Sequence, residues 1–135
     1  MPTTSDRAKA DPPTILIAED DVVLREMIGA MLAIHGYRVV VAADGKEALA
    51  SLRGGGIVAL VTDIVMPGGL DGWALAEQAR AIDPDIAVVY SSSRPAEPAR
   101  QVAGSLYLRK PYPPDAVADA IRRLAPRRGD GADAA

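Results

Sequence analysis

Acidic, hydroxyl and basic side chains follow four short apolar runs of this sequence. The four groups are Glu19-Asp20-Asp21, Thr62-Asp63, Ser91-Ser92-Ser93 and Arg109-Lys110-Pro111. Carboxylates brought together from such groups would repel one another, and their pKa values would rise unless a hard divalent cation neutralised them. Oxygen ligands without His or Cys favour Mg²⁺, with Mn²⁺ or Ca²⁺ as alternatives, over zinc or copper. The residue types therefore predict a metal site.

Asp63 is also suited to act as a nucleophile. A carboxylate can attack a phosphoryl group when a metal and a fixed cation neutralise the oxygens over which negative charge spreads. Asp63 is followed by Ile, Val and Met rather than by helix formers, so it is not an obvious helix cap. Lys110 would supply a point charge and a serine of 91–93 a hydrogen bond. For Glu19-Asp20-Asp21 alone, helix capping is an equally good interpretation.

Alternating strands and helices must bring these groups together. Runs rich in β-branched residues predict strands at 15–18, 39–42, 57–61, 86–90 and 106–108. Most runs are continuous rather than alternating, which is typical of a parallel sheet buried on both faces. Helical spacing of apolar residues lies between them, at Leu24, Met27, Ile28 and Met31, at Ala48, Leu49 and Leu52, at Leu75, Ala76, Ala79 and Ile82, and at Val117, Ala120, Ile121 and Leu124.

The sequence therefore predicts an α/β fold, a three-layer sandwich around a five-stranded parallel sheet of flavodoxin-like order. In such sheets ligands bind at the carboxyl ends of the strands, which is where all four groups stand. Asp44 and Glu47 form a possible capping pair before the second helix. The segment 93–105 contains Pro95 and Pro98 and few apolar residues, so we expect an irregular loop there.

Composition limits the classes of function. The length of 135 residues suits one domain, which we expect at 14–125 between disordered tails at 1–13 and 126–135. A net charge of −3 offers no basic face for nucleic acid, and the absence of cysteine excludes disulfides and thiolate zinc sites. No apolar run resembles a signal peptide or a membrane span, so we expect a cytoplasmic protein without a membrane partner.

The motifs together resemble those of bacterial two-component response-regulator receiver domains. They are ILIAEDD from Ile15 to Asp21, TDIVMP from Thr62 to Pro67, Asp71-Gly72 and Lys110-Pro111. The resemblance spans about 14–124, and all motifs occur in the family's order.

The resemblance implies roles at the metal site. Asp63 would be the phosphoacceptor, Glu19 and Asp20 would hold Mg²⁺ directly or through water, and the backbone carbonyl of Val65 would complete the protein ligands. Asp21 would be peripheral.

The resemblance also implies a switch. The family's Ser or Thr at the end of the fourth strand falls best on Ser92, with Ser91 as the alternative, and Lys110 would contact the phosphoryl group. Tyr107 matches the aromatic switch position, and the Lys110-Pro111 peptide bond would be cis. Gly68-Gly69-Leu70 lengthens the loop after Pro67, and 93–105 stands where the family has a helix.

By the same resemblance the chain is a signalling switch rather than an enzyme. It would take a phosphoryl group from a histidine kinase or a phosphotransfer protein and catalyse only its own phosphorylation and dephosphorylation. The ten or so polar residues after Leu124 are too few for an output domain, so we expect a stand-alone receiver. An unknown target protein, a phosphorelay and a phosphate sink all remain open as outputs.

Two rival interpretations fit less well. Phosphatases of the haloacid dehalogenase type also use Asp, Lys and Mg²⁺, but they place Asp-x-Asp on the first strand, where this chain has Glu19-Asp20-Asp21. A receiver-shaped module that is never phosphorylated would have lost acidic residues or Lys110, and all are present.

Overall fold

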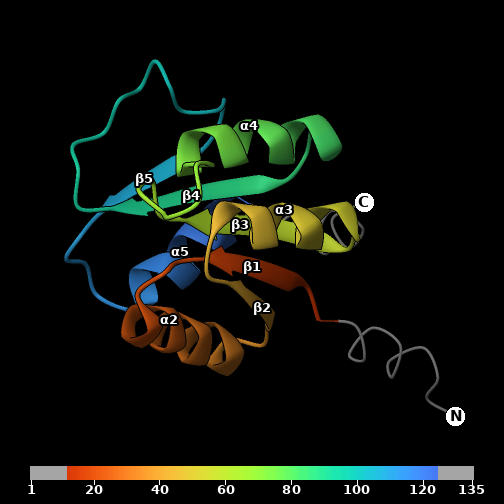
Figure 1. The fold of residues 1–135 in the computed structure, drawn as a ribbon. Coiled ribbons are helices and arrows are strands. Elements are labelled where there is room, and N and C mark those ends of the chain that lie inside the picture. The colour runs from red at the N-terminus through yellow and green to blue at the C-terminus, as the bar shows by residue number, and fades with distance from the viewer. Residues whose placement is uncertain (1–11, 125–135) are drawn as a thin grey trace, which may run out of the picture.

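The fold is an α/β sandwich in a computed structural model that describes residues 12–124. Its elements are β1 (Thr14–Ala18), α2 (Val22–Ile34), β2 (Arg38–Ala42), α3 (Gly45–Arg53), β3 (Ile57–Thr62), α4 (Gly72–Ile82), β4 (Ala87–Ser92), β5 (Leu106–Arg109) and α5 (Asp115–Leu124). The five strands are parallel in the order β2-β1-β3-β4-β5. The predicted five-stranded, flavodoxin-like sheet is confirmed (Figure 1).

Residues 12 and 13 are described, whereas the rest of the two predicted tails and Ala125, the predicted end of the domain, lie outside the described residues. Within 12–124 no helix combines the length and the hydropathy needed to cross a bilayer.

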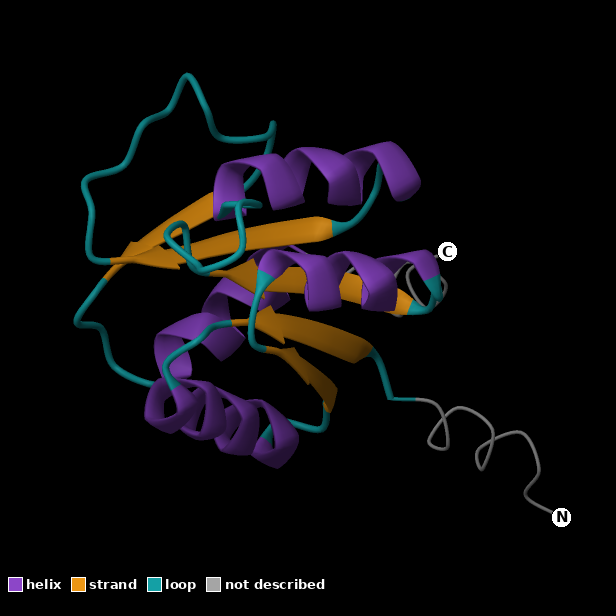
Figure 2. Ribbon diagram, in the orientation of Figure 1, coloured by secondary structure: helices purple, strands orange, loops and turns teal. Residues whose placement is uncertain are grey.

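The two faces of the sheet carry separate cores. Helices α3 and α4 cover one face and α2 and α5 the other (Figure 2). Leu16, Leu60 and Tyr90 belong to the core under α3 and α4, while Ile17 and Val61 belong to the core under α2 and α5. Successive side chains of a strand point to opposite faces. Ser92 therefore shares the α3/α4 face with Tyr90, and Ser91 faces α2 and α5.

Three aspartates cap the helices that begin near the carboxyl ends of the strands. Asp21 accepts a hydrogen bond of 3.1 Å from the backbone N–H of Leu24, and Asp44 and Asp71 cap α3 and α4 in the same way. Glu47 in turn accepts a bond of 2.9 Å from the N–H of Ala43, which confirms the predicted capping pair.

The helically spaced apolar residues of α2 are not all buried. Ile28 and Leu32 are buried, but Met27 is 49% exposed. Apolar residues occur nearly all around this helix, so periodicity alone does not select the face that packs.

The segment between β4 and β5 contains no helix in the described structure, as predicted, and projects beyond α4 (Figure 1). Side chains of the sheet hold it. The Tyr107 hydroxyl donates hydrogen bonds to the carbonyls of Arg94 (2.7 Å) and Pro95 (3.3 Å), and the Tyr90 hydroxyl accepts one of 3.0 Å from the N–H of Val102. These bonds satisfy part of the loop's backbone in place of helical ones.

An aromatic cluster fills the sheet face beneath this loop. Trp73 lies 5.0 Å from Tyr90 and 6.2 Å from Tyr107 between ring centroids. The guanidinium of Arg100 lies 5.2 Å from the centroid of the Trp73 ring. The cluster ties α4, β4, β5 and the loop together.

Candidate functional site

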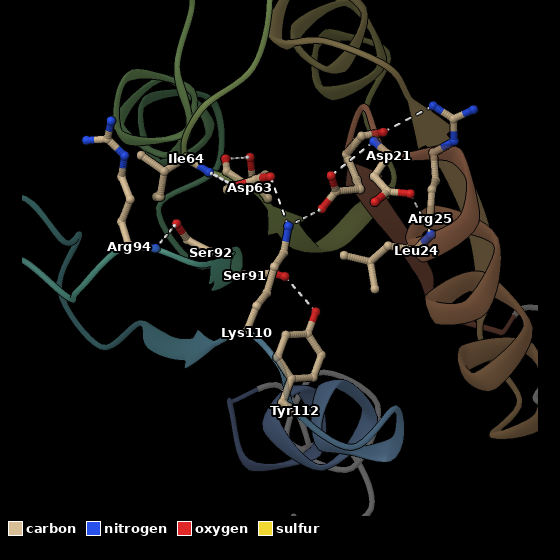
Figure 3. A network of polar contacts seen from close by, with 12 residues as sticks. Asp21, Leu24, Arg25, Asp63, Ile64, Ser91, Ser92, Arg94, Lys110 and Tyr112 are labelled. Atoms are coloured by element: carbon tan, nitrogen blue, oxygen red, sulfur yellow. Dashed lines mark hydrogen bonds and ion pairs between the residues drawn. The ribbon is translucent and has the colours of Figure 1, made fainter.

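The four groups singled out in the sequence meet at the carboxyl ends of β1, β3, β4 and β5. Lys110 Nζ donates hydrogen bonds to Asp63 Oδ2 (3.0 Å) and to Glu19 Oε1 (3.1 Å), as Figure 3 shows. One carboxylate oxygen each from Glu19, Asp20 and Asp63 lie within 4.8 Å of one another. The structure therefore gathers three carboxylates, two of which accept hydrogen bonds from one ammonium group.

Glu19 is held from several sides. Its backbone N–H donates to the carbonyl of Ala42 (3.1 Å), and its own carbonyl accepts from Arg25 Nη1 (3.1 Å). Its Oε2 accepts a bond of 3.1 Å from the N–H of Asp21, and only 2% of the residue is exposed. Asp21 itself caps α2, as the capping interpretation of this acidic run predicts.

Asp63 leaves the sheet at a tightly packed turn. Its N–H donates to the carbonyl of Ala18 (3.0 Å), and its Oδ1 accepts from the N–H of Ile64 (2.6 Å). Gly72, at the start of α4, packs so closely that an added Cβ would lie 2.0 Å from the Asp63 carbonyl oxygen. Only glycine permits this approach.

Lys110 follows β5 directly. Its backbone N–H donates to the carbonyl of Ser92 (2.8 Å), and the Lys110-Pro111 peptide bond is cis, as predicted.

Burial and the neighbouring charges at the site shift two pKa values. Burial raises the pKa of Glu19 to about 6, and the negative charge of Asp63 adds to the rise, while hydrogen bonds from Asp21 and Lys110 oppose it. Burial alone would lower the pKa of Lys110, but its hydrogen bonds to Asp63 and Glu19 outweigh burial and raise it. Lys110 is therefore charged at neutral pH.

The donor set fits a hard divalent cation. Glu19 is buried, Asp20 is exposed and Asp63 is partly buried, so the three carboxylates line the site from its base to its surface. The ligand atoms that these three side chains offer are carboxylate oxygens, which Mg²⁺ and Ca²⁺ prefer.

The two candidate serines have different partners. The buried Ser92 hydroxyl accepts a hydrogen bond of 3.1 Å from the N–H of Arg94. The Ser91 and Tyr112 hydroxyl oxygens lie 2.5 Å apart on the other side of β4 (Figure 3). Tyr107 of β5 pairs with Tyr90 of β4, and Ser92 lies two residues after Tyr90 on the same strand. Tyr107 and Ser92 therefore share one face of the sheet.

A depression lies beside Asp63 over the start of α4. Val65, which is 56% exposed, and Arg94 both line it. Its other lining residues are Ile64, Met66, Asp71, Trp73, Glu97 and Arg100.

Residues 15–122 match the family described as the response regulator receiver domain. The chain belongs to this family. It is 33% identical over 133 residues to the response regulator MprA of Mycolicibacterium vanbaalenii, with 92% of this chain and 57% of that relative covered. The receiver domain thus spans about half the length of the curated relatives it matches.

Solved receiver structures share the fold. A response regulator receiver protein from Sinorhizobium medicae is 32% identical, with a TM-score of 0.84, 88% of this chain and 98% of that chain covered. TrrA from Thermotoga maritima, solved in complex with Mg²⁺ and BeF, is 25% identical, with a TM-score of 0.74 and coverage of 82% and 97%. The expected receiver fold and family, those of two-component signalling switches, are confirmed.

The sequence interpretation missed Tyr112. It predicts nothing for this residue, whose hydroxyl reaches Ser91 at the end of β4. The signal available was its place among Pro111, Pro113 and Pro114, which marks a turn with few backbone donors.

Proposed function

We propose that Asp63 accepts a phosphoryl group from a phosphohistidine of a kinase or phosphotransfer protein, in a reaction that requires Mg²⁺. The observation that carries the proposal is that Lys110 Nζ lies within hydrogen-bonding distance of both Asp63 and Glu19. A fixed cation therefore stands beside the nucleophile, where negative charge develops during phosphoryl transfer.

The transfer would move a phosphoryl group from an imidazole nitrogen of the donor to a carboxylate oxygen of Asp63. A carboxylate oxygen of Asp63 forms a bond to phosphorus while the phosphorus–nitrogen bond to the donor imidazole breaks, and that electron pair stays on the nitrogen. Lys110 balances charge on the phosphoryl oxygens, and Ser92 offers them a hydroxyl donor. Hydrolysis of the aspartyl phosphate by water releases inorganic phosphate and returns the domain to its starting state, so besides the donor, water and Mg²⁺ the two steps need only the domain's own groups.

Glu19, Asp20 and Asp63 would hold the metal, and the backbone carbonyl of Val65 would complete the protein ligands. When bound, Mg²⁺ supplies positive charge that offsets the repulsion among the carboxylates and the incoming phosphoryl oxygens. Mn²⁺ or Ca²⁺ would suit the same oxygen ligands.

Ser92 and Tyr107 would convert phosphorylation into a change of shape. A Ser92 hydroxyl that moves to donate to a phosphoryl oxygen would carry the hydrogen bond that it accepts from the N–H of Arg94 with it. The carbonyl of Arg94 is also held by the Tyr107 hydroxyl, so the change reaches the loop 93–105. Ser91 is the weaker candidate because its hydroxyl is bonded to Tyr112 on the opposite face.

The donor protein must bring its histidine to Asp63, so it must cover the surface around the site. Val22, Val23 and Met27 of α2 expose 50%, 67% and 49% of their surface there. An apolar pocket between α2 and the segment after β5 continues this surface, lined by Leu24, Met27 and Tyr112. A partner helix with apolar side chains would suit it.

We propose residues 14–125 as the receiver unit, acting in the cytoplasm, where a kinase can draw on ATP. Its output is a protein contact, a phosphorelay or the draining of a kinase. The acidic rim disfavours nucleic acid as the partner of this site.

A small phosphodonor tests the proposal. The parent and Asp63→Asn are incubated with acetyl phosphate and Mg²⁺ and compared by intact mass. We expect one phosphoryl adduct on the parent, none on the variant and none when EDTA replaces Mg²⁺. An equal adduct on both proteins would refute the assignment of Asp63.

A further inference from the structure

The hydroxyl groups of Ser91 and Tyr112, 21 residues apart in the chain, lie 2.5 Å from each other beside the phosphoacceptor site (Figure 3). We propose that Tyr112 is a positioning residue: its hydroxyl, bonded to Ser91, fixes the segment from which Lys110 reaches Asp63 and Glu19. This inference rests on the proposed phosphorylation of Asp63.

The segment that carries Lys110 has few backbone donors of its own. Proline has no N–H, and Pro111, Pro113 and Pro114 make up most of the stretch between Lys110 and the start of α5 at Asp115. Backbone bonds hold its two ends, from Lys110 N–H to the Ser92 carbonyl (2.8 Å) and from Ala116 N–H to the Pro113 carbonyl (2.9 Å). Tyr112 stands between these ends and anchors the middle through its side chain.

The anchor on β4 is rigid. Ser91 is the penultimate residue of β4, pairs with Leu108 of β5 and is 1% exposed. Tyr112 packs its ring against the core under α2 and α5. Burial raises the pKa of Tyr112, so its phenol keeps its proton at neutral pH and the contact joins two neutral hydroxyls. The hydrogen bond between the two hydroxyls therefore persists at neutral pH.

Lys110 needs such an anchor because its side chain is long and flexible. Its ammonium sits at the end of a four-carbon stem, and ordering that stem costs conformational entropy. Bonds of 3.0 and 3.1 Å to carboxylates that follow two different strands, β3 and β1, require the backbone of residue 110 to stay in place. A shift of about 1 Å in that backbone would weaken both bonds and misplace the charge that stabilises transfer.

The test measures phosphorylation of Asp63 by acetyl phosphate in the parent, Tyr112→Phe, Ser91→Ala and the double variant. Tyr112→Phe keeps the ring and its packing, so it retains the fold even if Ser91→Ala does not. Tyr37→Phe is the matched control, because Tyr37 precedes β2 at the opposite end of the strands. Rates are followed as functions of both donor and Mg²⁺ concentration.

We expect each hydroxyl deletion to lower the maximal rate about fivefold, the factor that one net hydrogen bond is worth, with half-saturating Mg²⁺ unchanged. The double variant should be no slower than the singles, because both remove the same bond. A parental maximal rate in Tyr112→Phe, additive losses in the double variant, or an equal loss in Tyr37→Phe would overturn the inference. A parent that takes up no phosphoryl group would instead refute the proposed function, and this inference with it.

Discussion

Glu19 Oε1 accepts a hydrogen bond of 3.1 Å from Lys110 Nζ, yet the pKa of this carboxyl is raised to about 6. Burial raises the pKa of the carboxyl by more than the interaction with Lys110 lowers it, and repulsion from Asp63 raises it further. An additional cation at the site would therefore stabilise the charged form of Glu19.

The raised pKa predicts how stability depends on pH without metal. The folded protein binds the Glu19 proton more tightly than the unfolded chain does, so stability should fall as pH rises from about 4.5 to about 6. The loss in the free energy of unfolding is complete above pH 6 and absent below pH 4.5, and it amounts to about 2 kcal/mol. Urea unfolding in EDTA across this range should show the fall in the parent relative to Glu19→Gln. Parallel curves for the two proteins would contradict the shift.

Gly72→Ala should destabilise the domain by roughly 2 kcal/mol or more, because the new methyl group would collide with the Asp63 carbonyl. Gly29→Ala in α2 is the matched control: its Cβ meets nothing nearer than 3.6 Å, so removing a helical glycine should stabilise by about 0.5 to 1 kcal/mol. Denaturant unfolding checks both. Equal effects of the two substitutions would mean that the close approach at Gly72 has no energetic weight.

Val65 should lengthen the life of the phosphoryl group. Its exposed apolar side chain, which lines the depression beside Asp63, offers no hydrogen bond to orient an attacking water. Val65→Asn should speed dephosphorylation by about tenfold, because an amide can position that water. Loss of the adduct is followed by intact mass, with Ile34→Asn, at a 77% exposed position at the end of α2, as the control. An unchanged lifetime in Val65→Asn would reject the idea.

Ser92→Ala should separate phosphorylation from the structural response. Trp73 is the sole tryptophan and stacks on Tyr107, whose hydroxyl holds the loop at Arg94. We expect phosphorylation to change the fluorescence of Trp73 in the parent. Ser92→Ala should still take up the phosphoryl group, with most of the fluorescence change lost because the variant cannot link the phosphoryl oxygens to Arg94. A full fluorescence change in the phosphorylated variant would argue for Ser91 instead.

Most of the fold follows from local patterns in the sequence. The strands extend the predicted runs by a residue or two because backbone pairing continues beyond the apolar residues, into Thr14, Arg38, Thr62, Ser91, Ser92 and Arg109. β4 begins at Ala87, one residue after its predicted start at Ile86. The prolines of 93–105 predict that this segment forms no regular helix, as the structure shows. Capping by Asp44 is equally local.

Other features depend on contacts between distant residues. Which face of α2 packs is set by its neighbours, and Met27, one of its helically spaced apolar residues, is 49% exposed. The choice between Ser91 and Ser92 depends on where the strand alternation places each hydroxyl. Tyr112 lies between β5 and α5 and reaches Ser91 on β4. The prolines around it mark a turn, but no pattern along the chain identifies this partner.

The chemical identity of the modified residue tests the central claim most directly. After incubation with acetyl phosphate and Mg²⁺, borohydride reduces an aspartyl phosphate to homoserine, and peptide mass spectrometry locates it. We predict homoserine at position 63, formed with Mg²⁺ and absent with EDTA. Homoserine at Asp20 or Asp21, or a phosphoryl group that resists borohydride, would contradict the account.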